Sequence, residues 1–541
     1  MGASIRQRVG FTLLGAGFLA AAAYRVRSSL SPAVSSPVAS VTIRIAHWQL
    51  ENGAREGFDR LAAEYTKIHP AVKVMQLPIP QGIYPSWFIT QLVGGTAPDL
   101  IEISLGADTS DERIAEFFRP LTDLADAPNP YNRGTDLEGM PLRDTFRDGM
   151  KGGYFENLLE YYTVPMSCST VRMFYNLELV RKITGSDHLP GTYADLRGLF
   201  RRVAEYDARQ RASIVPIAGS KSNSVPLMNR LFSVQTQTLV EKLNPVGIIN
   251  EDEIDCSVRR ASDYLQGRWS LDSAAVRSGL GLMREIGRQM QPGFMQAERD
   301  DAALLFIRGQ AVSICSGSWD ATGIRQQADF PIGLAPIPYP TPQDPIYGAW
   351  AKGAPSEADN KSTSSFALTR SSAHPEVARD FLLFLASRSG SQIWTDNSGW
   401  PPAILGTRMG KDVTPFLPVT EGYVLGLQPN IGARGFLELT RCCTTHFHLL
   451  FGPTGSAEAF VQAVKPLYAE AVASDLRRTL RSNLEIVRRN DTQFAALVWI
   501  ARHHLATDAD GKLDHFLQSA TLTDRNLYQT RLALEEAAGK H

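Results

Sequence analysis

The chain has 541 residues, of which 43% are hydrophobic and 21% charged, and this composition predicts a soluble globular protein of two or more domains. Its formal net charge of -1 excludes the strongly basic or acidic balance that is typical of proteins binding nucleic acids or other highly charged partners. Five cysteines scattered over this length exclude the dense disulfide framework of a small secreted protein.

The N-terminal segment predicts a targeting signal. Arg6 and Arg8 precede an apolar run at 9–24, and about 16 residues is signal-peptide length but short for a spanning helix of about 20. We therefore expect residues 1–27 to be a signal peptide or a membrane anchor, and the Ser- and Pro-rich residues 28–40 to be a flexible tether. The mature protein is expected to be periplasmic or otherwise extracytoplasmic, either secreted or anchored to the cytoplasmic membrane.

The folded part begins with alternating strand and helix patterns. In chain order these patterns predict strand, helix, strand, helix and strand at residues 41–46, 58–65, 72–74, 84–93 and 100–103. This order with short links predicts a parallel sheet wound by helices. Trp48, Gln49 and Ser104 each follow one of these strands, so they would lie at the edge where such sheets bind ligands.

Further elements follow after a change of character near Tyr162. We expect a strand ending at 173–176, a capped helix at 192–204, mostly helices between 220 and 290, strands at 311–314 and 330–334, a Pro-rich crossing at 336–345, a helix at 374–385 and a rigid bend at 399–402. The strand at 311–314 opens at Gly317 onto Trp319 and Asp320, which places a large aromatic ring and a carboxylate at a strand end. Packing of Trp319 in the core remains the alternative.

The C-terminal tail predicts helices. Separate helical patterns cover residues 456–468, 471–489, 494–505 and 513–538. Such an appendage would cap the sheet, form a dimer contact or dock a partner. Its arginines favour a solvated face over a site for an acidic partner; they are Arg477, Arg478, Arg481, Arg488 and Arg489.

One cluster near the end of the main body invites a metal-site interpretation. Cys442 and Cys443 are adjacent, with His446 and His448 nearby. Tetrahedral zinc sites usually separate their cysteines by two to four residues, so a plain loop or helix end is the favoured interpretation. No cofactor is expected.

Short motifs in chain order resemble those of the extracellular solute-binding proteins of carbohydrate-uptake ABC transporters, a group similar to the maltodextrin- and multiple-sugar-binding proteins. After a first strand that ends in an aromatic residue, the motifs are 69–74 (HPAVKV), 95–100 (GTAPDL), 162–165 (YTVP), 174–176 (FYN), 306–311 (FIRGQA), 317–319 (GSW) and 374–381 (HPEVARDF). Two departures stand out. Tyr193 occupies the place of the tryptophan in the family's Pro-x-Thr-Trp pattern, and the tail beyond Gly452 is longer than usual.

The resemblance implies an α/β fold of the two-lobed periplasmic-binding-protein type II architecture, with a hinge and an additional C-terminal helical extension. By this analogy one lobe comprises 41–165 and 340–398, the other comprises 166–339 and 399–450, and the extension covers 451–541. A ligand would be held between the lobes, and binding would favour the closed form through its additional contacts there. The implied function is capture of a carbohydrate and its delivery to a membrane permease, without catalysis.

Sugar binding requires aromatic rings for the apolar face of a pyranose and polar side chains for its hydroxyls. The candidate ligand-binding residues are Trp48, Gln49, Ser104, Tyr162, Trp319, Asp320, Tyr347, Trp350 and Trp400. Core packing is the alternative for each tryptophan and a half-buried surface position for each tyrosine, while Asp320 would alternatively cap a helix. Asp99 is interpreted as structural.

Two other functions remain open at this point. One is a sensor that passes its closed state to a membrane receptor. The other is a secreted carbohydrate-active enzyme, which needs two carboxylates about 5–10 Å apart. Glu51, Glu102 and Asp320 are the residues that would supply such a pair.

Overall fold

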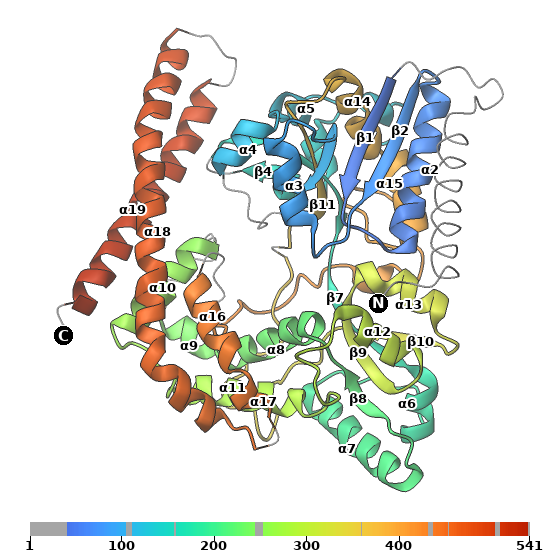
Figure 1. Ribbon diagram of the computed structural model, residues 1–541, viewed down its shortest axis with the longest axis vertical. Coiled ribbons are helices and arrows are strands. Elements are labelled where there is room, and N and C mark those ends of the chain that lie inside the picture. The colour runs from blue at the N-terminus through green and yellow to red at the C-terminus, as the bar shows by residue number, and fades with distance from the viewer. Residues whose placement is uncertain are drawn as a thin grey trace, which may run out of the picture.

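The computed structural model describes residues 41–103, 111–155, 158–243, 253–358, 360–430, 436–452, 454–503 and 509–538. Within these ranges the chain forms two lobes, each built around its own β-sheet, and a pair of long C-terminal helices that runs along one side of the molecule (Figure 1). The expected signal segment, the tether and Ser104 lie outside the described residues. Among the described helices, none combines the length and the apolarity that crossing a bilayer requires.

The first lobe contains a five-stranded sheet in the order β2-β1-β3-β11-β6. Its strands are β1 (Val41–His47), β2 (Val72–Pro78), β3 (Leu100–Ile103), β6 (Thr163–Cys168) and β11 (Ser362–Leu368). Strand β1 runs parallel to β2 and β3, which confirms the predicted parallel start, whereas β11 is antiparallel to β3 and β6. A small hairpin of β4 (Tyr154–Phe155) and β5 (Glu160–Tyr161) precedes β6.

Helices cover both faces of this sheet. They are α2 (Asn52–Ile68), α3 (Tyr84–Val93), α4 (Asp111–Phe117), α5 (Thr122–Asp126), α14 (Pro375–Leu385) and α15 (Arg388–Ser398), with the short 3-10 turns η1 (Pro130–Asn132), η2 (Leu142–Thr145) and η3 (Lys151–Gly153). Because side chains alternate along a strand, Leu100 and Phe366 pack in the core under α2, α14 and α15, and Ile101 and Ala367 pack in the core under α3. The result is a three-layered α/β/α lobe.

The second lobe contains a four-stranded sheet in the order β10-β7-β9-β8. Its strands are β7 (Val171–Asn176), β8 (Val215–Ala218), β9 (Ala311–Gly317) and β10 (Ile332–Ala335), and its helices are α6 (Leu177–Thr184), α7 (Tyr193–Gln210), α8 (Lys221–Gln235), α9 (Gln237–Leu243), α10 (Glu253–Leu265), α11 (Ala274–Gly287), α12 (Arg299–Ile307), α13 (Ala321–Gln327), α16 (Leu437–His446) and α17 (His448–Phe451). The predicted capped helix is confirmed as α7, whose capping box joins Thr192 and Asp195 reciprocally. Cys442 and Cys443 lie on α16, where Cys443 is buried.

The tail differs from the expected series of separate helices. Its first three patterns form one continuous helix, α18 (Ala457–Arg502), which is followed by α19 (Ala509–Ala538). The polar stretches between those patterns contain neither Gly nor Pro, so nothing there ends the helix, and Pro466 lies inside the first pattern. The first part of α18 belongs to the core of the second lobe, where it buries Phe460, Val461, Val464, Tyr468, Val472 and Leu476.

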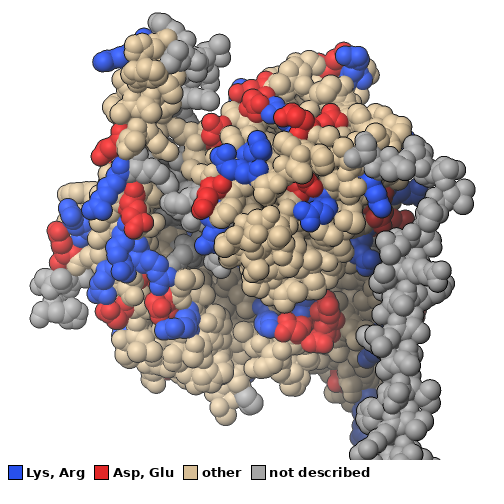
Figure 2. All heavy atoms as spheres, turned by 45° about the horizontal axis from the view of Figure 1, so that its top comes forward, with Lys and Arg blue, Asp and Glu red and all other residues tan. Residues whose placement is uncertain are grey.

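Charges of both signs alternate along the C-terminal helices, as Figure 2 shows on its left side. Arg477 pairs with Glu470 at 2.9 Å, and Arg478 lies 3.6 Å from Asp475 on the same helix. The Arg477–Glu470 pair is exposed and contributes little to stability, as is typical of a solvated helix face. Asp475 is instead fully buried and accepts hydrogen bonds from the backbone N–H groups of Glu438 and Leu439 at the start of α16.

Within the part of the chain that the structure describes, three passages connect the lobes. The first passage joins β6 to β7, the second leads from the segment after β10 into β11, and the third follows α15. Tyr347 and Ala351 still pack in the core of the second lobe, and Trp400 and Ile404 still pack in the core of the first. The second passage therefore lies after residue 351, and not at the expected boundary near 340 in the Pro-rich segment. The third lies after residue 404, and not at the expected boundary at 399.

Candidate functional site

The carboxyl end of β1 lies beside a fully buried carboxyl group on β3. Gln49 donates from Nε2 to Glu102 Oε1 at 2.7 Å, and the backbone N–H of Trp48 is 3.4 Å from Glu102 Oε2. Trp48 is half-buried and packs edge-to-face against Tyr84, with ring centroids 4.9 Å apart. Tyr84 in turn donates to the backbone carbonyl of Glu102 at 2.9 Å. One carboxyl group thus orients both predicted residues at this sheet edge.

Two titratable groups at this edge are held in their uncharged forms. Burial raises the pKa of the Glu102 carboxyl to about 8, although its hydrogen bond from Gln49 opposes the shift. Burial likewise lowers the pKa of His47 to about 4. The His47 ring stacks on Phe58 at 4.3 Å and bonds to Gln76 Oε1 through Nε2 at 3.1 Å. At neutral pH the buried side chains of Glu102 and His47 are therefore uncharged.

Strand β9 carries Trp319 to the boundary between the lobes. The strand ends at Gly317, and the 3-10 turn η4 (Ser318–Asp320) follows directly. Trp319 is half-buried and packs against the hydrophobic core of the first lobe, although it belongs to the second. A Cβ atom at position 317 would lie 2.3 Å from the Trp319 ring, so this approach requires glycine.

An ion-pair cluster links the two lobes next to Trp319. Arg299, the first residue of α12, lies 2.7 Å from Glu51, which directly precedes α2, and 3.6 Å from Asp320. Asp320 also accepts a hydrogen bond from Ser316 and makes no side-chain cap to α13. Burial raises the pKa of Asp320, and the charge of Arg299 opposes that shift. Glu51 Oε2 is buried and has no protein partner among the described residues.

Three of the four remaining candidates among the described residues are buried in the core of their own lobe. Tyr162 is buried against Phe155, and Tyr347 is buried in the second lobe, where its hydroxyl donates to Glu285 Oε2 at 2.7 Å. Trp400 is buried in the first lobe with its indole N–H unpaired within the described structure. Trp350 is half-buried, and its backbone carbonyl accepts from Thr238 at 3.5 Å.

The structure thus brings Trp48 and Gln49 together at one sheet edge, and Trp319 and Asp320 together at the facing lobe. Arg299 was missed by reasoning from the sequence. No local pattern distinguishes it, because a single arginine at a helix start is common, and its partner Glu51 is remote in the chain. Glu102 has a weak signal, a carboxylate at an otherwise apolar strand position.

A family model described as "bacterial extracellular solute-binding protein" matches residues 60–414, more than half of the chain. The chain belongs to this family. An uncharacterized ABC transporter extracellular-binding protein of Pyrococcus horikoshii is 21% identical over 391 residues, covering 71% of this chain and 75% of that protein. Family membership implies an extracytoplasmic location for this solute-binding protein and a place in an ABC transport system.

Solved structures share the fold of this solute-binding protein. The GacH receptor of Streptomyces glaucescens, solved unliganded and with acarbose, has a TM-score of 0.56 at 14% identity, covering 80% of this chain and 98% of that one. Maltose-bound MalE3 of T. maritima gives 0.54 at 15% identity, with 80% and 99% covered. A solute-binding protein of Thermotoga lettingae bound to α-D-tagatose gives 0.56 at 15% identity, with 80% and 100% covered. These likenesses confirm the two-lobed periplasmic-binding-protein architecture.

Proposed function

We propose that this solute-binding protein captures a sugar or short oligosaccharide between its lobes and delivers it to the permease of an ABC transporter. The observation that carries the proposal is the arrangement at the lobe boundary. A half-buried tryptophan lies beside a buried carboxyl group in each lobe: Trp48 with Glu102 in the first, and Trp319 with Asp320 in the second. Acarbose, maltose and tagatose are bound by proteins of the same fold.

The side chains suit the chemistry of a sugar. Indole rings cover the apolar C–H face of a pyranose, and polar groups satisfy the hydroxyls that would be costly to bury unpaired. Protonated Glu102 is both a donor and an acceptor, and Glu51 Oε2 is a buried acceptor without a protein partner within the described residues. Trp400 is a weaker candidate, because its ring is buried in the core of the first lobe. We further propose Gln49, Ser104, Tyr162, Tyr347 and Trp350 as weaker contributors.

Closure of the lobes provides the transport signal. The Glu51–Arg299 pair joins the lobes, so it is made only when they approach one another. A ligand that contacts both lobes adds to this differential stabilisation and shifts the population toward the closed form. A permease would then recognise the closed pair of lobes, and residues 1–27 would direct or anchor the protein outside the cytoplasm.

Binding without turnover follows from this proposal. The family and the fold are those of solute-binding proteins, which are not enzymes. Glu51 and Asp320, two of the three candidates for the pair of carboxylates that an enzyme would need, both contact Arg299 instead of flanking an open space. This arrangement supports a binding role over hydrolysis.

The test is a thermal-shift screen of the mature protein against monosaccharides, oligosaccharides, polyols and glycerol phosphates. A ligand present at 100 times its dissociation constant stabilises the folded state by about 2.7 kcal/mol, which gives a visible rise in Tm. The expected result is one strong hit that is recovered chemically unchanged. Hydrolysis of the hit would support the enzyme alternative, and the absence of any shift would contradict sugar binding.

A further inference from the structure

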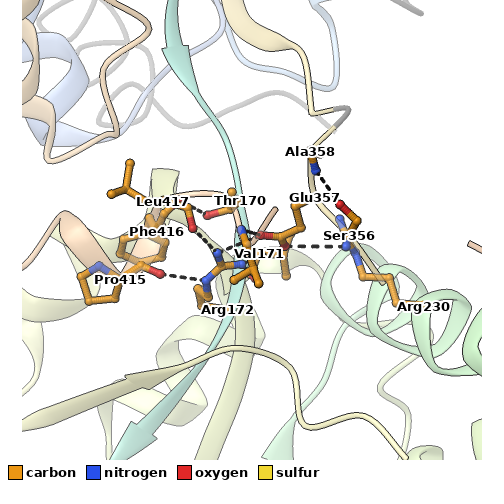
Figure 3. Close-up of polar contacts among 11 residues, drawn as sticks. Thr170, Val171, Arg172, Arg230, Ser356, Glu357, Ala358, Pro415, Phe416 and Leu417 are labelled. Atoms are coloured by element: carbon orange, nitrogen blue, oxygen red, sulfur yellow. Dashed lines mark hydrogen bonds and ion pairs between the residues drawn. The ribbon is translucent and has the colours of Figure 1, made fainter. Parts of the chain in front are cut away.

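A buried ion pair lies where the chain enters the second lobe. Arg172 is the second residue of β7, and its side chain is only 1% exposed. Its guanidinium faces the carboxylate of Glu357 in a two-pronged arrangement, with Nη1 to Oε1 and Nη2 to Oε2 both at 2.9 Å (Figure 3). Glu357 lies 185 positions further along the chain, in the segment that leads into β11.

Every N–H donor of this guanidinium has an acceptor. Besides the two bonds to Glu357, Nε donates to the carbonyl of Pro415 at 2.8 Å, Nη2 to that of Leu417 at 2.6 Å and Nη1 to that of Val171 at 2.8 Å. Arginine has five such donors in a planar fork, so the site uses the full capacity of the side chain. Lysine has neither the number nor the planar geometry of these donors.

The residues joined in this way come from all three passages between the lobes. Arg172 directly follows the first passage, which begins after Cys168. Glu357 precedes the second passage, and Pro415 and Leu417 follow the third, which begins after Ile404 in the core of the first lobe. One guanidinium therefore holds the second-lobe end of each passage.

The carboxylate of Glu357 is itself bound to further segments of the second lobe. Val419 donates its backbone N–H to Glu357 Oε2 at 2.9 Å, and the N–H of Glu357 donates to the carbonyl of Val419 at 2.7 Å. Arg230 on α8 lies 4.0 Å from Glu357 Oε1 and ties the carboxylate to the body of the second lobe. Removal of one partner would leave the other charge buried and uncompensated.

We propose that Arg172 and Glu357 form a clamp that fixes the pivot of lobe closure. The clamp joins the three passages to the second lobe as one rigid base, so bending on closure is confined to the stretches between this base and the first sheet. The hydrogen bonds of the planar guanidinium are directional and fix one relative position of the three passages. Apolar contacts are not directional and would allow the passages to shift against one another. This proposal needs lobes that move, as the proposed function does, but it does not need the ligand to be a sugar.

Hydrogen–deuterium exchange of the ligand-free, full-length mature protein tests the clamp. In Glu357→Gln the amide group opposes one prong of Arg172 with its own N–H, so that bond is lost. Loss of a charge-assisted hydrogen bond should speed exchange about tenfold or more. The expected result is faster exchange in three peptides together, covering 169–173, 355–358 and 414–420. Asp187→Asn is the matched control, since Arg181 and Asp187 form an exposed two-pronged pair in the same lobe.

A second variant separates the clamp from a local stabilising contact. Arg172→Lys retains the charge next to Glu357 but cannot also reach Pro415 and Leu417, so exchange should rise mainly in 414–420. Small-angle X-ray scattering of Glu357→Gln should show a broader distribution of lobe separations than that of the wild type. The distribution for Asp187→Asn should equal that of the wild type. Faster exchange in only one passage of Glu357→Gln, or an unchanged scattering profile, would overturn the clamp. Both readouts are made without ligand, so failure of sugar binding would leave them interpretable.

Discussion

Glu51 of the first lobe and Arg299 of the second lie 2.7 Å apart, between Oε1 and Nη2, at the boundary where the lobes meet. The pair is remote in sequence and crosses between the two lobes. It can exist only while the lobes are close, so it acts on the equilibrium between open and closed forms more directly than on the stability of either lobe.

Arg299→Met should weaken ligand binding by up to about fivefold, since a partly exposed pair contributes about 1 kcal/mol or less. The substitution leaves the carboxylates of Glu51 and Asp320 without their shared cation, which favours separation of the lobes. Titration calorimetry at low and high salt measures the effect, because the wild-type affinity should fall with salt and that of the variant should not. Arg181→Met, which breaks an exposed pair, is the control. Equal salt dependence in all three proteins would contradict a role in closure.

Two tryptophans should respond differently to replacement by alanine. Trp319→Ala should abolish or sharply weaken ligand binding while the fold is retained, because the ring is half-buried at the lobe boundary. Trp400→Ala should instead destabilise the protein by about 3–5 kcal/mol, since that ring is buried in the first-lobe core against Trp394. Calorimetric binding and chemical unfolding separate the two effects. Normal binding by Trp319→Ala would refute the site in the second lobe.

Gly317→Ala should impair binding through Trp319 alone. The added Cβ atom would lie 2.3 Å from the indole ring, so the ring must move, while the backbone at 317 has an ordinary extended conformation. We expect a loss of affinity that approaches that of Trp319→Ala. Gly281→Ala on α11 is the matched control: its Cβ meets no atom within 4 Å, and it should stabilise the helix by about 0.4–1 kcal/mol. Indole fluorescence would report the displacement.

Glu102 should make stability fall as the pH rises. Its pKa is about 8 in the folded state and 4.5 in the reference state, so the folded protein binds its proton more tightly. The resulting stabilisation is complete below about pH 4.5 and is lost as the pH rises toward 8. Glu102→Gln resembles the protonated acid and should remove this component of the decline in Tm between pH 5 and 8. Identical pH profiles would show that Glu102 is ionised in the folded protein.

The two ends of α18 should tolerate substitution unequally. Phe460→Ala should cost about 3–5 kcal/mol, because Phe460 is fully buried in the core of the second lobe. Phe494→Ala, at a ring that is 40% exposed, should cost far less. Chemical unfolding of both variants measures the difference. A large loss of unfolding free energy in Phe494→Ala but not in Phe460→Ala would show that the distal part of the helix has the greater structural role.

Much of the fold was predictable from local patterns. The helix at 84–93 and the strand at 100–103 have the predicted bounds, and α7 begins at its predicted cap. These elements depend on apolar periodicity, glycine and capping residues within a few positions of each other, and such signals are present in a single sequence. The prediction of three separate helices between 456 and 505 was wrong, because the polar residues between these patterns include no Gly or Pro and α18 continues through them.

Contacts between remote residues were decided only by the tertiary structure. The sequence by itself determined the alternation of strands and helices at 41–103, the aromatic residues after β1 and β9 and, through its motifs, the family. Strands β6, β8 and β11 were not predicted. It held no signal that Arg299 would meet Glu51, or that Arg172 would join three passages of the chain. The physical reason is that the position of a charged side chain depends on partners that only the folded chain brings together, and these partners lie 185 and 248 positions away.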